Sequence, residues 1–325
     1  MTAMENQPKD QPKDRPMVTM VTAAYNESES LPAMYTALKT ELEKIGVDWE
    51  WLVVDDHSTD RTFDILSDLA ARDRRVRSIR FSRNFGSHAA ITCGFHHARG
   101  DCAIVMDADL QDPPEKISQL LDQWRGGAPG GAQVVWAERE EAERGGILDE
   151  WFARLYYSLM RRTEALRNIP AACFFLVSRP VLDAFKEFHE SHASLHGLIT
   201  WMGFSQAVIT YRRQARKAGQ SRWSLGRKIK LVMDTVTSFT YFPIRAMSYV
   251  GFLTALGGFA YAGVVICNAI RGLPPQGWAS TMVVILILGG IQMIMLGVLG
   301  EYLWRALDES RRRPRYIIES VLGKK

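Results

Sequence analysis

Short apolar runs alternate with helical stretches over most of the chain. The apolar runs have the length and the β-branched and aromatic content of buried strands, and they cover residues 17–23, 49–55, 76–82, 102–107, 132–138 and 206–212. Helical patterns fall between them, at 28–45, 60–73, 86–98 and 114–125. Continuous apolar strands that alternate with helices are typical of α/β proteins. The pattern therefore predicts a doubly wound, mostly parallel sheet.

Two long uncharged stretches follow this alternating region. Arg245 and Arg271 enclose 25 residues without a charge, and Arg271 and Glu301 enclose 29 more. A helix needs about 20 apolar residues to cross a bilayer, and core helices are seldom uncharged for so long. Because the link "RGLPPQG" is short, the two stretches predict an antiparallel transmembrane hairpin. The alternative is a pair of core helices in a soluble domain.

Basic residues gather at the outer ends of the predicted hairpin. Residues 212–230 hold eight basic and no acidic residues, and residues 311–315 hold four more basic ones, whereas the link holds only Arg271. By the positive-inside rule, the N-terminal domain and the tail are cytoplasmic, in a multi-pass inner-membrane protein with two spans. The net charge of +4 is too small to indicate a nucleic-acid binder. The clusters instead favour phosphates and anionic membrane lipids as partners.

These features divide the chain into seven segments. A polar, proline-containing repeat predicts a disordered tail at 1–16. The remaining segments are the α/β domain (17–212), a basic juxtamembrane segment (213–245), the first span (246–270), a short external loop (271–277), the second span (278–303) and a basic cytoplasmic tail (304–325). The four cysteines are scattered without CxxC spacing, which predicts reduced thiols and no disulfide framework.

Polar motifs follow four of the predicted strands immediately: "AAYNE", "DDHSTD", "SRNFGSH" and "DADLQD". Ligands of α/β sheets bind beyond the carboxyl ends of the strands. Asp107 and Asp109 are two residues apart and can project to the same side. A pair of hard oxygen ligands suits Mg²⁺ or Mn²⁺ that bridges a diphosphate. An isolated Asp-x-Asp is usually a solvated turn, but four motifs at strand ends favour a metal site.

A second candidate metal motif is the histidine-containing segment "HESHASLH". His189, His192 and His196 recur at helical spacing, but no cysteine or catalytic glutamate accompanies them in a zinc pattern. The segment is therefore interpreted as a surface helix.

An ordered set of motifs carries a family resemblance. The segments "TAAYNESESL", "VVDDHSTDRT", "SRNFGSHAAITCGFHHARGD" and "MDADLQDPPE" resemble a family 2 glycosyltransferase of GT-A fold. With the hairpin and "RKAGQSRWS", "FTYFPIR" and "GEYLWRALDESRRRPRYII", the chain is similar to polyprenyl-phosphate glycosyltransferases, which include bactoprenol glucosyltransferases and dolichol-phosphate mannose synthase. The similarity extends from Met17 to Ile318. It implies inverting transfer of a hexose from a nucleotide-sugar, expected to be UDP-linked, to membrane polyprenyl (undecaprenyl) phosphate.

The resemblance also implies roles for individual residues. The donor is expected to contact Ala23, Tyr25, Glu27, Asp55, Asp56, Arg83, Asp107, Ser221 and Arg222. The metal ligands would be Asp107, Asp109 and Gln111, and the acceptor phosphate would meet Arg139, Arg154 and Arg179. Asp107, Asp109 and Arg139 are the expected catalytic residues.

Two positions depart from the family pattern. His57 stands where many relatives have the glycine of "DDGS", which is expected to alter contacts near the nucleotide. Cys173, in "AACFFLVSR", occupies a position that is often acidic. A phosphate monoester has a second pKa of about 6 and is largely dianionic at neutral pH, so it needs no general base. Positioning and metal stabilisation of the leaving diphosphate are therefore expected to carry catalysis.

Two other functions remain open from the sequence. A processive polysaccharide synthase would share the fold, but such enzymes usually carry a QxxRW motif and more spans, and "QSRW" has a different spacing. A catalytically inactive membrane scaffold is argued against by Asp56, Asp107 and Asp109, whereas Cys173 leaves it open. The sequence does not define the sugar, the choice of UDP or GDP, the glycan pathway or the oligomeric state, for which a homo-oligomer is one option.

Overall fold

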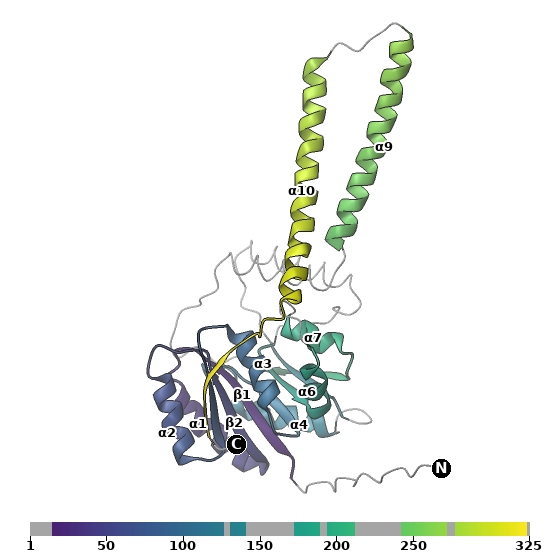
Figure 1. The fold of residues 1–325 in the computed structure, drawn as a ribbon. Helices are drawn as coiled ribbons and strands as arrows, with labels where there is room; N and C mark the ends of the chain where they lie inside the picture. The colour runs from purple at the N-terminus through teal and green to yellow at the C-terminus, as the bar shows by residue number, and fades with distance from the viewer. Residues whose placement is uncertain are drawn as a thin grey trace, which may run out of the picture.

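The protein consists of an α/β domain and a pair of long helices that extend from one side of it (Figure 1). The computed structural model describes residues 15–126, 131–140, 172–188, 194–211, 242–271 and 277–323. The predicted tail at 1–16 therefore lies almost entirely outside the described residues, as does most of the basic juxtamembrane segment 213–245.

An eight-stranded sheet in the order β7-β5-β6-β4-β1-β2-β3-β8 forms the centre of the domain. Its strands are β1 (Met17–Ala24), β2 (Asp48–Asp55), β3 (Val76–Phe81), β4 (Cys102–Val105), β5 (Val134–Arg139), β6 (Phe174–Ser178), β7 (Gln206–Tyr211) and β8 (Ile318–Leu322). The six strands expected from the apolar runs are all present. Within the described sheet, four neighbouring pairs are parallel and three are antiparallel. The sheet is thus more mixed than predicted, because β6 and β8 run against their neighbours.

Helices cover both faces of the sheet, as the doubly wound prediction requires. They are α1 (Leu31–Ile45), α2 (Thr62–Arg72), α3 (Ser87–His97), the short 3₁₀ helix η1 (Pro114–Lys116), α4 (Ile117–Gly126), α6 (Arg179–Lys186) and α7 (Leu195–Trp201). One face packs against α1, α2 and α4, and the other packs against α3, α6 and α7. In β1, Met20 joins the first core and Val21 joins the second. Side chains alternate across a strand, so a strand buried on both faces is mostly apolar, and the few polar side chains in it must be paired.

A buried ionic group lies inside this sheet. The Glu50 carboxylate accepts hydrogen bonds from the Thr19 hydroxyl at 2.8 Å, the Arg77 guanidinium at 2.9 Å and the Arg99 backbone N–H at 2.8 Å. Its side chain is only 4% exposed and that of Arg77 is 8% exposed. Buried charges are tolerated when they are paired and hydrogen-bonded, and this group joins the amino ends of β1, β2 and β3 to the turn that precedes β4.

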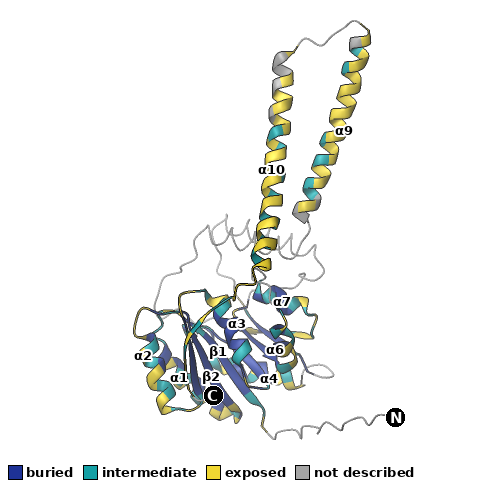
Figure 2. Cartoon of the chain, in the orientation of Figure 1, coloured by how far each residue is buried: buried dark blue, intermediate teal, exposed yellow. Residues whose placement is uncertain are grey.

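Two apolar helices follow the α/β domain: α9 (Phe242–Ile270) and α10 (Trp278–Ser310). Both are long and apolar enough to cross a membrane, over Ala246–Asn268 and Val283–Ser310. None of the most apolar window of either helix is buried inside the protein, and Figure 2 shows them exposed along their length. The alternative of two soluble core helices therefore does not fit. Helix α10 continues past the predicted end of the span at 303, with an Arg305–Glu301 ion pair at 2.9 Å in its last turns.

The segment after α10 returns to the α/β domain, which the sequence analysis did not predict. Strand β8 pairs antiparallel with β3 and forms one edge of the sheet. Ahead of it, the Tyr316 ring stacks on Phe81 with 5.0 Å between ring centroids, and its hydroxyl lies 2.9 Å from Nδ1 of His96. The tail segment that was expected to be a basic cytoplasmic extension thus contributes a strand to the domain.

The histidine-containing segment is not entirely on the surface. His196, on α7, packs against the rings of Trp136 and Phe175 at centroid distances of 5.6 and 5.4 Å, and its Nε2–H donates to the Ala172 carbonyl at 2.8 Å. The surface interpretation is therefore wrong for this residue, whereas His189 and His192 lie outside the described residues. A neutral imidazole is required here because nothing in these contacts balances a second proton.

Acidification is expected to destabilise the fold through His196. Burial lowers the pKa of His196 from 6.5 to about 4, so the unfolded chain takes up a proton at a higher pH than the folded chain does. This contribution to stability is complete above about pH 6.5 and falls as the pH drops toward 4, with a loss of about 1 to 2 kcal/mol at pH 5. Thermal unfolding in detergent between pH 7 and pH 5 measures it. His196→Phe removes the titrating group, and an unchanged pH dependence in that variant would contradict the assignment.

Candidate functional site

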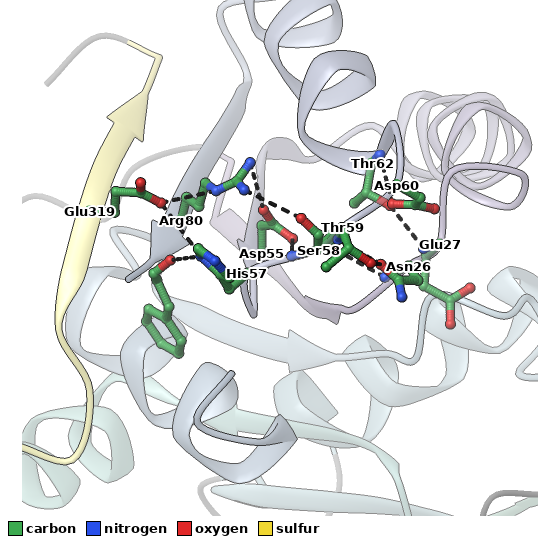
Figure 3. Close-up of polar contacts among 11 residues, drawn as sticks. Asn26, Glu27, Asp55, His57, Ser58, Thr59, Asp60, Thr62, Arg80 and Glu319 are labelled. Atoms are coloured by element: carbon green, nitrogen blue, oxygen red, sulfur yellow. Dashed lines mark hydrogen bonds and ion pairs between the residues drawn. The ribbon is translucent and has the colours of Figure 1, made fainter. Parts of the chain in front are cut away.

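The loops after β1 and β2 are bonded to each other at the carboxyl edge of the sheet. The Asn26 N–H donates to the Ser58 hydroxyl at 2.9 Å, and the Thr59 N–H donates back to the Asn26 side-chain oxygen at 2.8 Å. The Glu27 N–H donates to the Thr62 hydroxyl at 2.9 Å (Figure 3). Asn26 adopts a left-handed backbone with φ of 57°, a conformation that Asn accepts more readily than most residues. These bonds turn the chain so that Tyr25, at 36% exposure, stands at the edge with Glu27 beside it.

The two aspartates after β2 have different surroundings. Asp55 is fully buried. Its Oδ1 accepts the Ser58 N–H at 3.0 Å, and its Oδ2 lies 3.7 Å from the Arg80 guanidinium without a hydrogen bond to any described residue. A buried carboxylate oxygen without a hydrogen bond is costly, and a ligand N–H or O–H would satisfy it.

Asp56 instead orders the loop after β3. Its two carboxylate oxygens accept the backbone N–H groups of Phe85 at 2.6 Å and Gly86 at 2.8 Å. Burial raises the pKa of Asp56, although these two bonds oppose the rise. Asp55 and Asp56 were both expected to contact the donor; within the protein, Asp56 bonds to the loop after β3, whereas Asp55 keeps one carboxylate oxygen without a hydrogen bond to the described residues.

The loop after β4 carries the acidic motif. Asp107 and Asp109 are partly exposed, and the Asp109 carboxylate accepts the Gln111 N–H at 3.1 Å across a tight turn in which Leu110 has φ of 55°. Gln111 is 3% exposed, and its side-chain oxygen has no hydrogen-bond partner within the described part of the chain. The motif therefore presents a partly exposed pair of carboxylates beside an unpartnered amide oxygen.

The third acid of the motif, Asp112, is buried and paired rather than solvated. Its side chain is 1% exposed; it accepts a hydrogen bond from the Tyr211 hydroxyl and lies 4.0 Å from the Arg139 guanidinium. The Arg139 Nε in turn donates to the Tyr211 oxygen at 3.4 Å. Although burial opposes its charge, Tyr211, Asp112 and Cys173 raise the pKa of the Arg139 guanidinium. The ends of β5 and β7 thus hold Arg139 next to the acidic loop.

Cys173 lies at the same edge of the sheet. Strands β4 and β6 are antiparallel and pair Val105 with Phe175. The same register continued by two residues brings Cys173 opposite Asp107. The thiol is exposed, so the position that is often acidic in relatives does belong to this site.

Arg179 is not at this edge. It begins α6 after Ser178, which pairs with Cys102 at the amino end of β4. Its guanidinium donates to the backbone oxygens of Ala98, at 3.1 Å, and Gly100, and lies 3.6 Å from Asp183. The expectation that Arg179 binds the acceptor phosphate is corrected by this position, because the antiparallel direction of β6 carries it to the opposite end of the sheet.

The remaining expected residues have mixed outcomes. Ala23 is the last but one residue of β1 and packs against the core, and Arg83 is exposed in the loop after β3 with its guanidinium 4.1 Å from the centre of the Phe85 ring. Arg154, Ser221 and Arg222 lie outside the described residues.

Sequence reasoning missed Tyr211 and Arg80. Tyr211 ends β7, lies next to the end of the strand predicted at 206–212, and could have been found by the strand-end rule, whereas Arg80 lies inside a strand and gave no such signal.

Comparison with known proteins identifies the family of the chain. Residues 19–185 match the model of glycosyl transferase family 2. An uncharacterized glycosyltransferase of Bacillus subtilis is 36% identical over 307 residues, which cover 94% of each chain. A bactoprenol glucosyl transferase of Shigella phage SfV is 35% identical, with coverage of 93% of this chain and 98% of the relative. A prophage bactoprenol glucosyl transferase homolog of Escherichia coli is also 35% identical, with coverage of 94% and 99%.

Solved structures give a weaker similarity. Glucosyl-3-phosphoglycerate synthase from Mycobacterium tuberculosis in complex with phosphoglyceric acid has a TM-score of 0.49 and 18% identity, over 69% of this chain and 80% of that one. The assignment of the chain to a family therefore rests on the match to the family model and on the relatives that cover nearly the whole chain. The chain, with its mixed α/β sheet, therefore belongs to glycosyltransferase family 2.

Proposed function

We propose that the chain transfers a hexose from a UDP-sugar to membrane polyprenyl phosphate, with inversion, and releases UDP. The observation that carries this proposal is the presence, in one chain, of an acidic and basic strand-end site and two exposed helices apolar enough to cross a membrane. Such a chain can bind both a soluble phosphorylated donor and a lipid acceptor. The names of the full-length relatives support the same acceptor.

The orientation of the hairpin follows from the same reasoning. Helix α9 begins and α10 ends on the side of the α/β domain (Figure 1), and basic residues dominate both of those flanks. By the positive-inside rule these ends face the cytoplasm. The domain then lies where nucleotide-sugars are made, with its site next to the membrane surface.

For the donor, the carboxyl edge offers Asp55, Tyr25 and Glu27. Asp55 Oδ2, which has no hydrogen bond to any described residue, can accept one from a base N–H or a ribose hydroxyl. The exposed Tyr25 side chain offers an aromatic ring at the same edge of the sheet. These residues would hold the nucleoside, while the acidic loop after β4 holds the diphosphate end.

The residues of the acidic loop fit a divalent metal. Among the described residues, no three His, Cys, Asp or Glu side chains are grouped closely enough to bind a metal alone, so the donor diphosphate would have to complete the shell. Asp107, Asp109 and the unpartnered oxygen of Gln111 are hard oxygen ligands suited to Mg²⁺ or Mn²⁺. When bound, the metal neutralises charge on the leaving diphosphate.

The acceptor needs positioning more than proton removal. An oxygen of the acceptor phosphate forms a bond to the anomeric carbon while the bond from that carbon to the donor diphosphate breaks, and the leaving UDP takes the electron pair. One such displacement inverts the anomeric configuration. Because the phosphate is already dianionic at neutral pH, no base is required. Arg139, held by Asp112 and Tyr211, is the described cation that would orient it.

Replacement of Cys173 by Ala is expected to leave kcat within about threefold of the unchanged protein, because the thiol supplies neither a proton nor a metal ligand in this scheme. Steady-state transfer assays with both substrates measure the effect, and a melting temperature excludes unfolding. Loss of turnover in a folded Cys173→Ala protein would show that the position is catalytic and that the scheme is wrong.

A transfer assay in detergent tests the proposed function. Purified protein is mixed with undecaprenyl phosphate, Mg²⁺ or Mn²⁺, and labelled UDP-glucose, UDP-galactose, UDP-N-acetylglucosamine or GDP-mannose in separate reactions. We expect label in the organic phase with one UDP-sugar. Label in an insoluble polymer would favour a processive synthase, and absence of product from a protein that binds nucleotide would favour a scaffold.

A further inference from the structure

The last strand of the sheet contacts the loop that follows Asp55. Strand β8 lies beside β3 and pairs Arg80 with Ser320 and Phe81 with Ile318, with an irregularity between the two pairs. Glu319 lies between these paired positions, and its side chain is 48% exposed. Figure 3 shows it pointing from β8 toward Arg80 and His57. The strand that follows the membrane helices thus contributes a carboxylate near the nucleotide side of the site.

Arg80 connects this carboxylate to Asp55. Its Nε donates to the Glu319 carboxylate at 3.0 Å, its Nη2 donates to the Ser58 carbonyl at 3.3 Å, and its Nη1 lies 3.7 Å from Asp55 Oδ2. The guanidinium carbon also lies 4.6 Å above the Phe63 ring. Arg80 therefore approaches Asp55 closely enough for charge attraction, yet it leaves the Asp55 Oδ2 without a hydrogen bond.

Glu319 also faces His57, the residue that stands in place of a glycine. His57 has a left-handed backbone with φ of 60°, which is unfavourable for a side chain larger than glycine unless contacts hold it. Its Nδ1 lies 3.0 Å from the Phe81 carbonyl and 3.7 Å from the Glu319 carboxylate. The turn that follows Asp55 and Asp56 is thus held by β3 on one side and by β8 on the other.

We propose that Glu319 is a positioning residue for the donor nucleotide. By holding Arg80 and facing His57, it keeps the Asp55 Oδ2 available to accept a hydrogen bond from the nucleotide. The strand after the membrane hairpin is then part of the donor site, and not merely a tether. This inference rests on the proposed function in one respect, that Asp55 contacts the nucleotide.

Glu319 is expected to affect nucleotide binding because it competes with Asp55 for the Arg80 guanidinium. With Glu319 present, Arg80 is attracted to two carboxylates and, of these two, donates a hydrogen bond only to Glu319. Without that charge, Arg80 is free to close onto Asp55 as a direct ion pair, and a nucleotide would have to break this pair before it could bind. The cost appears in nucleotide affinity, because neither Glu319 nor Arg80 is placed at the reacting atoms.

The test compares four full-length proteins in detergent: unchanged, Glu319→Gln, Arg80→Gln and the double variant. Affinities for UDP and GDP are measured by calorimetry, and donor KM, acceptor KM and kcat are measured in the transfer assay. Glu319→Gln is expected to weaken nucleotide binding and raise donor KM by about threefold to fivefold, the effect typical of one partly exposed ion pair. Acceptor KM and kcat should stay within about twofold. In the Arg80→Gln background, Glu319→Gln should have no further effect.

Val321→Thr provides a matched control. Val321 lies two residues along the same strand on the same face, is 51% exposed, and pairs with Ile79. Thr keeps the β-branched shape, so this variant should match the unchanged protein in nucleotide affinity and melting temperature.

Each outcome decides one question. Unchanged nucleotide affinity in Glu319→Gln would overturn the inference, as would an equal loss in the Arg80→Gln background or a loss that Val321→Thr shares. A lower melting temperature with normal donor KM would give Glu319 a purely structural role and would also overturn it. Failure of the unchanged protein to bind any nucleotide would instead refute the proposed function.

Discussion

Replacement of Asp109 by Asn is expected to reduce sugar transfer by about a thousandfold, the scale of losing one group that stabilises charge at a reacting centre. Asn keeps the shape of Asp109 and can still accept the hydrogen bond from the Gln111 N–H. What it lacks is the negative charge that a divalent metal requires. The effect should fall on kcat, because the nucleoside is held elsewhere, by the loops after β1 and β2.

Asp122→Asn supplies the control for this experiment. Asp122 is exposed on α4, undergoes the same chemical change, and should transfer sugar within about twofold of the unchanged protein. A second readout is the dependence of UDP binding on Mn²⁺. The metal should tighten UDP binding to the unchanged protein and fail to do so in Asp109→Asn. Normal transfer and normal Mn²⁺ dependence in that variant would remove the metal site from the acidic loop.

Arg77→Met should lower the free energy of unfolding by about 3 to 5 kcal/mol, the range for a buried ion pair that loses one partner. The Glu50 carboxylate would then stay buried with hydrogen bonds from Thr19 and the Arg99 N–H but without a balancing charge. Because the group joins three neighbouring strands and the turn before β4, the loss should affect unfolding of the whole α/β domain. Urea denaturation in detergent, followed by tryptophan fluorescence, measures it.

Arg74→Met is the matched control for Arg77→Met. Arg74 is exposed three residues earlier in the chain, and its substitution should change stability by less than about 0.5 kcal/mol. A double variant, Glu50→Met with Arg77→Met, should recover much of the lost stability, because an apolar pair avoids the uncompensated charge. A small effect of Arg77→Met alone would mean that the pair contributes little to this fold.

The sheet was largely predictable because its strands are apolar on both faces. Runs such as 17–23 and 49–55 sit in a parallel block with helices on either side, and burial of both faces leaves an unmistakable pattern in the sequence. Strand β8 has no such pattern. It is a five-residue edge strand with alternating exposure, and it follows a basic turn, so nothing local separates it from a tail.

The sequence predicts which edge of the sheet holds the candidate site, but it does not predict which side chains pair with one another there. The four strand-end motifs do follow β1 to β4 at the carboxyl edge of the sheet, and the acids after β4 lie there. The sequence could not say that Asp112 would be buried beneath Tyr211 and Arg139, because those partners are 99 and 27 positions away along the chain. The predicted location of Arg179 was wrong for a related reason. The amino-acid composition of β6 does not indicate whether this strand runs parallel or antiparallel to β4.

Mass spectrometry of the lipid product tests the central claim most directly. The purified full chain is incubated with the preferred UDP-sugar and either undecaprenyl phosphate or undecaprenol, which lacks the phosphate. The account predicts that the lipid phosphate gains the mass of one hexose and that the alcohol gains nothing, since the acceptor nucleophile is a phosphate oxygen. Addition of hexose to the alcohol, or of several hexoses to either lipid, would contradict it.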